Sequence, residues 1–294
     1  MKKEDNGVSK ETAERTTIKG QTFDEERALY NATHTDVVCC NFAGTADGES
    51  ALKEASDIKV KECTFSLRYP LWHVVDFSVN EVTMEETCRA PIWYARHGKL
   101  KNCEIRGVKA VRECEDIQIK DSTINSVEFG WKCDGLDLKD VTISSEYIFF
   151  DSRNVSLTNV TMTGKYSFQY VDGLKITDCN LDTKDAFWHS KNVTVKNCVV
   201  KGEYLAWFSE NLTLINCKII GTQPFCYCKN LKLVNCTMEG CDLAFEYSEV
   251  EADVKGRIDS VKNPKSGTIT CDEVGEIIMG NAVMECTGQV VIRD

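Results

Sequence analysis

Four side chains that could transfer protons recur along the chain at a regular interval. Glu113 and Asp151 are 38 residues apart, Lys132 lies midway between them, and His189 follows Asp151 after another 38 residues. If every nineteen residues form one coil, the two carboxylates lie two strand spacings apart, about 9.6 Å. That distance is near the upper end for the carboxyl pair of an inverting glycosidase. The candidate catalytic residues are therefore Glu113, Asp151, His189 and Lys132.

The alternative for this column is a solvated ladder of compensating charges. Lys132 would keep both neighbouring carboxylates ionised, which counts against either one as a general acid. The column nevertheless varies while the rest of the repeat stays constant, and such a column often displays a ligand-binding surface.

Two arginines suggest that the ligand is anionic. Arg68 and Arg89 occupy matching positions on adjacent coils, where their charges repel unless they share an anion. That anion could be a uronate, or Glu49 or Glu54 in an internal salt bridge. The candidate substrate-binding residues are Arg68, His73, Arg89, Tyr94 and Tyr170.

The interval comes from a repeat of nineteen residues. The stretch from Asn192 to Glu210 is followed by two similar copies, each opening with alternating apolar residues. The second apolar residue of each opening marks the repeat: Ile119, Leu138, Leu157, Ile176, Val195, Leu214, Leu233 and Ala252. A fixed period of this length indicates a solenoid, and alternation within it indicates strands. We predict an all-β, right-handed parallel β-helix of about twelve to fourteen coils, because nineteen is no multiple of a left-handed hexapeptide repeat.

The domain organisation follows from where the repeat holds. We expect a disordered or weakly ordered lead over 1–20, although Ile18 could begin a cap strand, and a single β-helix domain over 21–294. Within it we expect a degenerate coil at 35–42, a loop at 43–55 and regular coils over 57–254. A C-terminal loop at 255–267 and further coils through Cys271 and Val290 complete the chain.

Two adjacent columns of large apolar residues directly precede the charged column in the repeat, and only one of them can face inward. One holds all five tryptophans: Trp72, Trp93, Trp131, Trp188 and Trp207. The other holds Leu71, Ile92, Val111, Phe149, Phe168, Phe187 and Phe225. We favour the tryptophans as the inward column and the phenylalanines as the surface stripe, while the reverse stays open.

Turn residues and cysteines are explained by structure. One position is always Glu, Asp or Asn, as in Asn197, Asn216 and Asn235, and such side chains can form a hydrogen-bonded ladder along the turns.

The sixteen cysteines include no C-x-x-C pair, and seven share one inward column. We interpret them as free packing residues and expect no metal and no cofactor.

Charge and composition limit the possible partners and the cellular compartment of the protein. A net charge of −11 argues against nucleic acid as a partner. The polar first twenty residues lack a signal peptide, and no apolar run could span a membrane. Many cysteines without an export signal favour a reducing cytoplasm.

Several segments carry a family resemblance. They include FDEERALY at 23–30, YPLWH at 69–73, GEYLAWFSENLTLINC at 202–217 and DSVKNPKSG at 259–267. Over about 23–278 the chain resembles a bacterial family of unassigned function with a pectin-lyase-like right-handed β-helix. The resemblance implies the fold but no reaction, since the Asp-Asp, Asn-Thr-Asp and Gly-His-Gly motifs of pectin-degrading hydrolases are missing.

Two functions fit these observations. The first is a cytoplasmic protein that binds or acts on an acidic oligosaccharide along the charged column. The alternative is a non-catalytic scaffold or protein-interaction solenoid. The oligomeric state is left open by the sequence.

Overall fold

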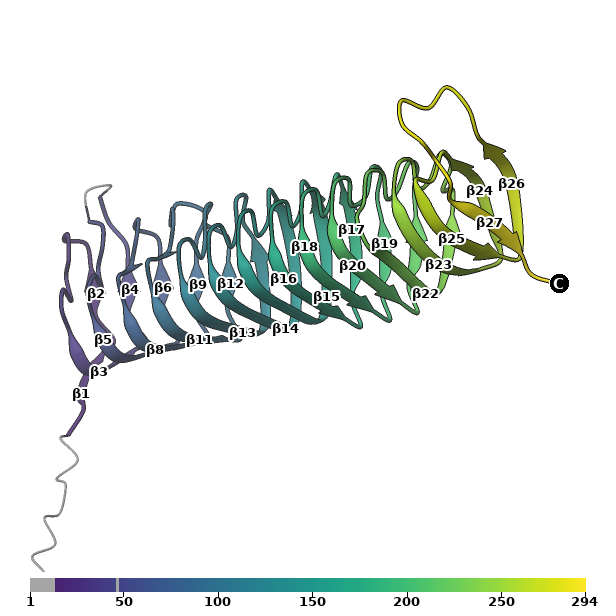
Figure 1. Ribbon diagram of the computed structural model, residues 1–294. Helices are drawn as coiled ribbons and strands as arrows, with labels where there is room; N and C mark the ends of the chain where they lie inside the picture. Colours follow the sequence, from purple (N-terminus) through teal and green to yellow (C-terminus); the bar gives the residue numbers. More distant parts are fainter. Residues whose placement is uncertain (1–13, 46–47) are drawn as a thin grey trace, which may run out of the picture.

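The chain winds through fourteen turns of a parallel β-solenoid, each turn laying its strands beside those of the turn before (Figure 1). The computed structural model describes residues 14–45 and 48–294, so that 1–13 of the expected disordered lead lie outside the described residues. Within those ranges no helix occurs, and hence none that could cross a membrane. The residues in register along the first strand of successive coils are Ile18, Val37, Val60, Val79, Leu100, Ile119, Leu138, Leu157, Ile176, Val195, Leu214, Leu233, Ala252, Ile269 and Val290. The all-β fold, the parallel pairing and the nineteen-residue coil predicted from the sequence are confirmed.

Each coil contributes two main strands separated by a turn. The first-strand ladder contains β1 (Thr16–Lys19), β3 (Thr33–Val38), β5 (Ser56–Lys61), β8 (Val75–Asn80), β11 (Arg96–Lys101), β16 (Asp172–Thr177), β18 (Lys191–Lys196), β20 (Glu210–Ile215), β25 (Ser266–Cys271) and β27 (Gln289–Ile292). The second contains β2 (Thr22–Phe23), β4 (Asn41–Phe42), β6 (Thr64–Phe65), β9 (Thr83–Met84), β12 (Glu104–Ile105), β17 (Asn180–Lys184), β19 (Val199–Lys201) and β21 (Lys218–Ile220). Five strands run through both: β13 (Glu115–Asn125), β14 (Asp134–Glu146), β15 (Arg153–Lys165), β22 (Leu231–Glu239) and β23 (Glu249–Lys255). Two short pairs complete the set, β7 (Leu71–Trp72) with β10 (Ile92–Trp93), and β24 (Arg257–Lys262) with β26 (Glu273–Ile278).

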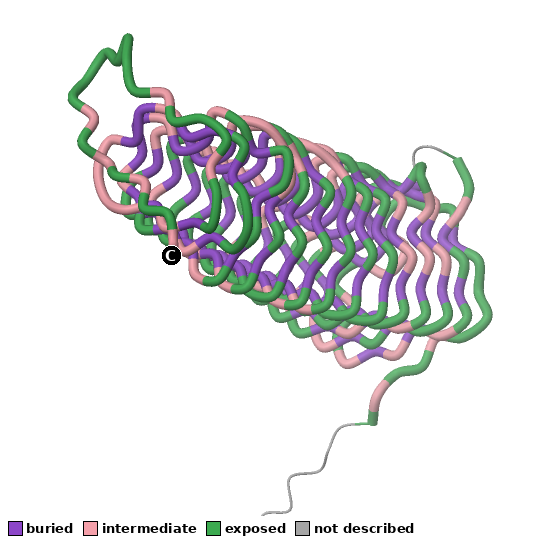
Figure 2. Tube along the Cα trace, turned by 90° about the vertical axis from the view of Figure 1, so that its right-hand side faces the viewer, coloured by how far each residue is buried: buried purple, intermediate pink, exposed green. Residues whose placement is uncertain are grey.

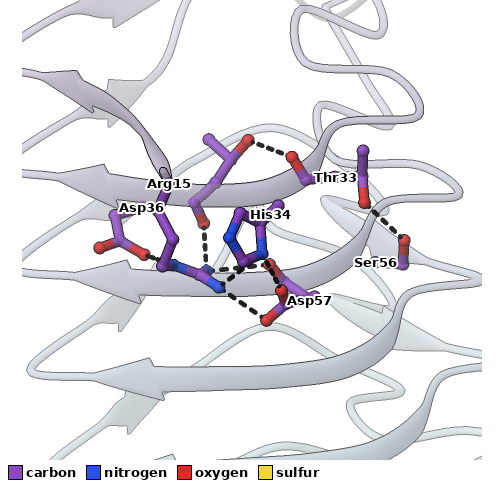
Figure 3. Close-up of polar contacts among 7 residues, drawn as sticks. Arg15, Thr33, His34, Asp36, Ser56 and Asp57 are labelled. Atoms are coloured by element: carbon purple, nitrogen blue, oxygen red, sulfur yellow. Dashed lines mark hydrogen bonds and ion pairs between the residues drawn. The ribbon is translucent and has the colours of Figure 1, made fainter. Parts of the chain in front are cut away.

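The N-terminal end is ordered further out than expected. Thr16–Lys19, inside the segment expected to be disordered or weakly ordered, form β1, and Ile18 pairs with Val37 in the possible cap strand. Arg15 fixes this strand, because its guanidinium contacts Asp36 at 2.6 Å and Asp57 at 2.8 Å (Figure 3). Nδ1 of His34 lies 2.5 Å from the other carboxylate oxygen of Asp57. One arginine thus ties together three successive coils.

The C-terminal coils depart from the predicted register. The loop expected at 255–267 contains strand β24, which pairs with β26. Ala252 pairs with Ile269 rather than Cys271, so this coil has seventeen residues instead of nineteen. Too few apolar residues follow Ala252 for the repeat pattern to reveal that this coil is two residues shorter than the others.

The turn column forms the predicted ladder. Nδ2 of Asn235 donates to Oδ1 of Asn216 at 2.9 Å, and Nδ2 of Asn216 donates to Oδ1 of Asn197 at 3.1 Å. All three residues have φ between 52° and 54°. Asparagine tolerates this left-handed conformation better than most side chains, which explains why this position accepts so few residue types.

The orientation expected for the two aromatic columns is wrong. Phe149, Phe168 and Phe187 are buried, whereas the five tryptophans are half-buried. Buried and more exposed positions alternate along the coils (Figure 2). Polarity fits this orientation at Trp188 and Trp207, whereas the buried Nε1 atoms of Trp72 and Trp93 have no hydrogen-bond partner among the described residues. The indole Nε1 of Trp188 donates to the carbonyl of Tyr204 at 2.7 Å, and Trp207 donates to Gln223 at 2.9 Å. Phenylalanine has no such polar atom to satisfy and packs in the dry core.

All sixteen cysteines are free, and fourteen of them are buried. Most of their thiols donate to the backbone carbonyl two residues earlier, as Cys198 does to Lys196 at 3.0 Å. The interpretation of the cysteines as free packing residues is confirmed.

Candidate ligand-binding groove

One outward column carries most of the predicted site residues. Each member donates its backbone N–H to a carbonyl of the next coil, over 2.8–3.1 Å, and each has φ of 52–60°. The members of this variable column are His73, Tyr94, Glu113, Lys132, Asp151, Tyr170, His189, Phe208 and Tyr227. The main chain repeats so regularly that the side chains alone make one coil differ from another.

Aromatic rings stack along both ends of this column. His73 and Tyr94 stack at the N-terminal side, with ring centroids 4.9 Å apart. On the C-terminal side Tyr170, His189, Phe208 and Tyr227 form a continuous stack, with successive centroid distances of 5.0, 5.0 and 4.7 Å. Because stacked rings cover one another's faces, these ladders present ring edges to solvent.

The stack is interrupted over three coils. Glu113, Lys132 and Asp151 occupy the positions between Tyr94 and Tyr170. At the strand spacing of about 4.8 Å, the interruption separates the two rings by about 19 Å. We call Glu113, Lys132 and Asp151, with the space above them, the charged gap.

A groove of about 560 Å³ lies over the N-terminal part of the charged gap. It is lined by four predicted site residues, His73, Tyr94, Glu113 and Lys132. The sequence analysis missed the rest of the charged lining, which comprises Arg96, Glu115, Asp134 and Arg153. These four residues lie in register with one another at the start of successive first strands. Their nineteen-residue spacing could have identified them as a second charged column.

The other predicted residues lie outside this groove. Asp151 and Tyr170 are exposed at its C-terminal side, and His189 has both ring faces covered by Tyr170 and Phe208. Arg68 forms an ion pair with Glu49 at 3.0 Å. The salt-bridge alternative for Arg68 is therefore confirmed.

Arg89 lies in a second, smaller pocket of about 220 Å³. Tyr69, Trp93, Lys109 and Arg112 line it together with Arg89, so that three cations and no acid surround the space. Lys109 and Arg112 also pair with Glu128, at 3.2 and 3.6 Å, outside that lining. Arg89 makes no ion pair in the ranges 14–45 and 48–294.

Trp93 and Arg112 separate this cationic pocket from the groove. They are neighbours in the tryptophan column, and their next residues, Tyr94 and Glu113, line the groove. A ligand in the groove therefore lies one column away from Arg89, the one cation of this pocket that makes no ion pair within the described residues.

Glu113 is held in its ionised form. Burial raises the pKa of its carboxyl, but hydrogen bonds from Tyr94 and Arg112 outweigh burial and bring the pKa below its ordinary value. The Arg112 guanidinium lies 3.4 Å from Glu113. Glu113 can therefore accept a proton or a hydrogen bond, but it is unsuited to donating a proton at neutral pH.

Among residues 14–45 and 48–294, no group of three or more His, Cys, Asp or Glu side chains is arranged to hold a metal ion. The side chains that line the groove can form hydrogen bonds, ion pairs and contacts with ring surfaces.

Fold and groove together define an elongated β-solenoid with a charged groove on one flank. The chain belongs to the DUF3737 family, described as a protein of unknown function, whose pattern it matches over residues 16–292. The family resemblance seen in the sequence is thereby confirmed. No curated protein sequence matches the chain.

Solved structures with a distant likeness include two carbohydrate enzymes. The A-module of mannuronan C-5 epimerase AlgE4 from Azotobacter vinelandii is 12% identical, with 94% of this chain and 91% of that chain covered and a TM-score of 0.31. The catalytic domain of a GH87 α-1,3-glucanase is 10% identical, with 94% and 64% covered and a TM-score of 0.27. Likenesses this weak carry no conclusion about the activity of this chain.

Proposed function

We propose that the charged gap binds a short stretch of an acidic oligosaccharide. The observation that carries the proposal is the interruption of the exposed ring stack by Glu113, Lys132 and Asp151. Elsewhere on the column rings cover one another. At the gap, Tyr94 stacks on His73 and on Trp93 of its own coil, but the next coil offers it Glu113 in place of a ring, and a sugar could pack there.

The polar lining suits a ligand with both hydroxyl and carboxylate groups. Carboxylates of Glu113 and Glu115 accept hydrogen bonds from sugar hydroxyls, while Arg96 and Lys132 donate to oxygen acceptors. Lys132 is exposed and makes no ion pair within the described residues, so its charge is available to a ligand carboxylate. The cationic pocket one column away adds to the preference for an anion.

Binding is the part of the function that the geometry supports. Glu113 is in the form that a general base requires, but a hydrolytic reaction would also need an acid close by. We propose the cytoplasm as the setting because free buried thiols suit a reducing compartment.

Calorimetric titration with oligouronides of two to six residues would test the proposal. Neutral oligosaccharides of the same length serve as the ligand control. We expect saturable binding of the uronides that weakens as salt is raised, because ion pairs at an exposed groove are screened. Equal binding of charged and neutral sugars, or none of either, would contradict an acidic ligand.

A further inference from the structure

A second hollow, of about 390 Å³, opens beside the groove on β11, β13, β14 and β15. Its exposed lining side chains are His97, Lys99, Asp116, Gln118, Asp137 and Asn154. The same four strands supply the second charged column of the groove, which consists of Arg96, Glu115, Asp134 and Arg153. In each strand the residue that follows this column lines the hollow, as Asp116 follows Glu115. The two cavities are therefore neighbours on every one of these coils.

One carboxylate forms a wall between the cavities. Oδ1 of Asp134 accepts a hydrogen bond from Nδ2 of Asn154 at 2.6 Å, and Asn154 lines the hollow. The other oxygen of Asp134 lies 3.5 Å from the guanidinium of Arg153, which lines the groove. A ligand in the groove is thus separated from the hollow by the width of one side chain.

The hollow has room because Gly135 carries no side chain. Asp116 and Asn154 occupy the corresponding position on the coils before and after it, both with φ 53°, and Gly135 has φ 77°. A Cβ atom at Gly135 would lie 2.6 Å from Oδ1 of Asp116 and would reduce the hollow. The glycine therefore leaves open a space that side chains fill on the neighbouring coils.

Stacked rings limit the groove along the solenoid axis. On the N-terminal side the ring of Tyr94 stacks on that of His73, and beyond the charged gap the ring of Tyr170 stacks on that of His189. Across the coils the groove is followed by the polar lining of the hollow. A ligand longer than the charged gap therefore finds its next hydrogen-bonding partners across the coils rather than along the axis.

The charges of the hollow suit an uncharged sugar ring. Asp116 and Asp137 contribute two carboxylates, whereas Lys99 contributes one ammonium. Nδ1 of His97 already lies 2.9 Å from Asp76, and its Nε2 lies 3.9 Å from Asp116. A carboxylate of the ligand would be repelled here, because the acids outnumber the lysine. Sugar hydroxyls can instead donate to both carboxylates and accept from Lys99.

We propose that the charged gap and the hollow at Gly135 are two adjacent subsites. The first takes an acidic sugar, and the second takes an uncharged sugar joined to it, so that the ligand lies across the coils. This inference rests on the proposed binding of an acidic oligosaccharide at the charged gap. It adds that the preferred ligand contains both kinds of sugar.

Calorimetric titration of the full chain with two trisaccharides tests this inference. One is a triuronide, and the other joins a single glucuronate to two neutral xyloses. We expect the mixed trisaccharide to bind about threefold more tightly or better, since one net hydrogen bond is enough for that difference. Gly135→Asn fills the hollow with a side chain that tolerates a left-handed backbone. It should remove the advantage of the mixed trisaccharide while triuronide binding remains.

Two further variants accompany this test. Gln118→Ala removes an exposed amide from the lining of the hollow and should reduce the same advantage. Gly240→Asn is the matched control, because Gly240 has φ 62°, has no neighbouring atom within 4 Å of an added Cβ, and lines neither cavity. It should keep the full preference for the mixed trisaccharide.

The outcomes separate this inference from the proposed function. Binding of the triuronide with no advantage of the mixed trisaccharide would overturn the second subsite and leave the proposed function standing. An advantage that persists in both Gly135→Asn and Gln118→Ala, once circular dichroism has shown them folded, would also overturn the second subsite. Absence of binding by either trisaccharide would overturn the proposed function, and the second subsite with it.

Discussion

The rings of Tyr170 and His189 lie 5.0 Å apart and within 7° of parallel, so that each covers a face of the other. The stack continues to Phe208 and Tyr227 along the solenoid axis. An exposed aromatic row of this kind could be taken for a sugar-binding platform. Its faces are already used in the stack, however, and its contribution is to hold successive coils together.

Removing one ring from the stack should lower stability without affecting ligand binding. Phe208→Ala removes contacts with His189 and Tyr227. We expect a loss of about 1–3 kcal/mol in the free energy of unfolding, since each aromatic pair contributes about 0.5–1.5 kcal/mol. Urea unfolding measures the loss. A neutral change in stability accompanied by weaker uronide binding would assign the stack to the ligand site instead.

The asparagine ladder can be tested with two substitutions at one position. Asn216 is exposed, so the cost of its removal comes from the left-handed backbone and the ladder hydrogen bonds rather than from burial. Asn216→Ala should destabilise the chain by about 1–2 kcal/mol. Asn216→Gly keeps the backbone conformation accessible and should cost less. Thermal unfolding that ranks glycine below alanine would contradict the role of the backbone.

The N-terminal coils should lose stability in acid. Hydrogen bonds from Arg15, and then from His34, hold the pKa of Asp57 below its ordinary value. A carboxyl with a lowered folded pKa stabilises the fold above its unfolded pKa, and this contribution is lost as pH falls through the folded value. The protection of Thr16–Lys19 from hydrogen exchange, relative to the intrinsic amide rate at each pH, should therefore fall below about pH 4. In Asp57→Asn this protection should already be lower at neutral pH and should change little in acid.

Most cysteines should resist alkylation while the chain is folded. Burial raises the pKa of Cys63 and of Cys228 to about 11, and neither thiol is exposed. Only Cys39 and Cys286 are accessible. Mass spectrometry after iodoacetamide treatment at pH 8 should show no more than two labels, and all sixteen after denaturation. Rapid native labelling of further thiols would show that the coils open.

Much of the fold could be predicted from the sequence because each coil repeats the same requirements. Val195, Leu214 and Leu233 mark the register directly, and the Asn column marks the turns. The inward aromatic column could not be chosen, since Phe187 and Trp188 are adjacent and both apolar. In the structure Trp188 faces outward and donates to a carbonyl, while Phe187 packs in the core.

The sequence predicts which candidate site residues share one column along the solenoid, but it does not predict which columns meet at the groove. Glu113, Lys132 and Tyr94 share a column that the period reveals, and the structure brings them to one groove. Arg96 and Arg153 reach the same groove from a neighbouring column. How the two columns face one another depends on the curvature of the turn, which the nineteen-residue period does not contain.

Filling the charged gap with an aromatic ring tests most directly whether the gap binds an acidic oligosaccharide. Lys132→Tyr would place a ring where the stack is interrupted, at an exposed position with the same backbone conformation as Tyr94 and Tyr170. Calorimetric titration with an oligouronide should then show binding lost, or weakened at least tenfold, while the unfolding temperature stays the same or rises. Lys196→Ala, at an exposed position in β18, should bind as the unmodified chain does. Full affinity in Lys132→Tyr would contradict the account.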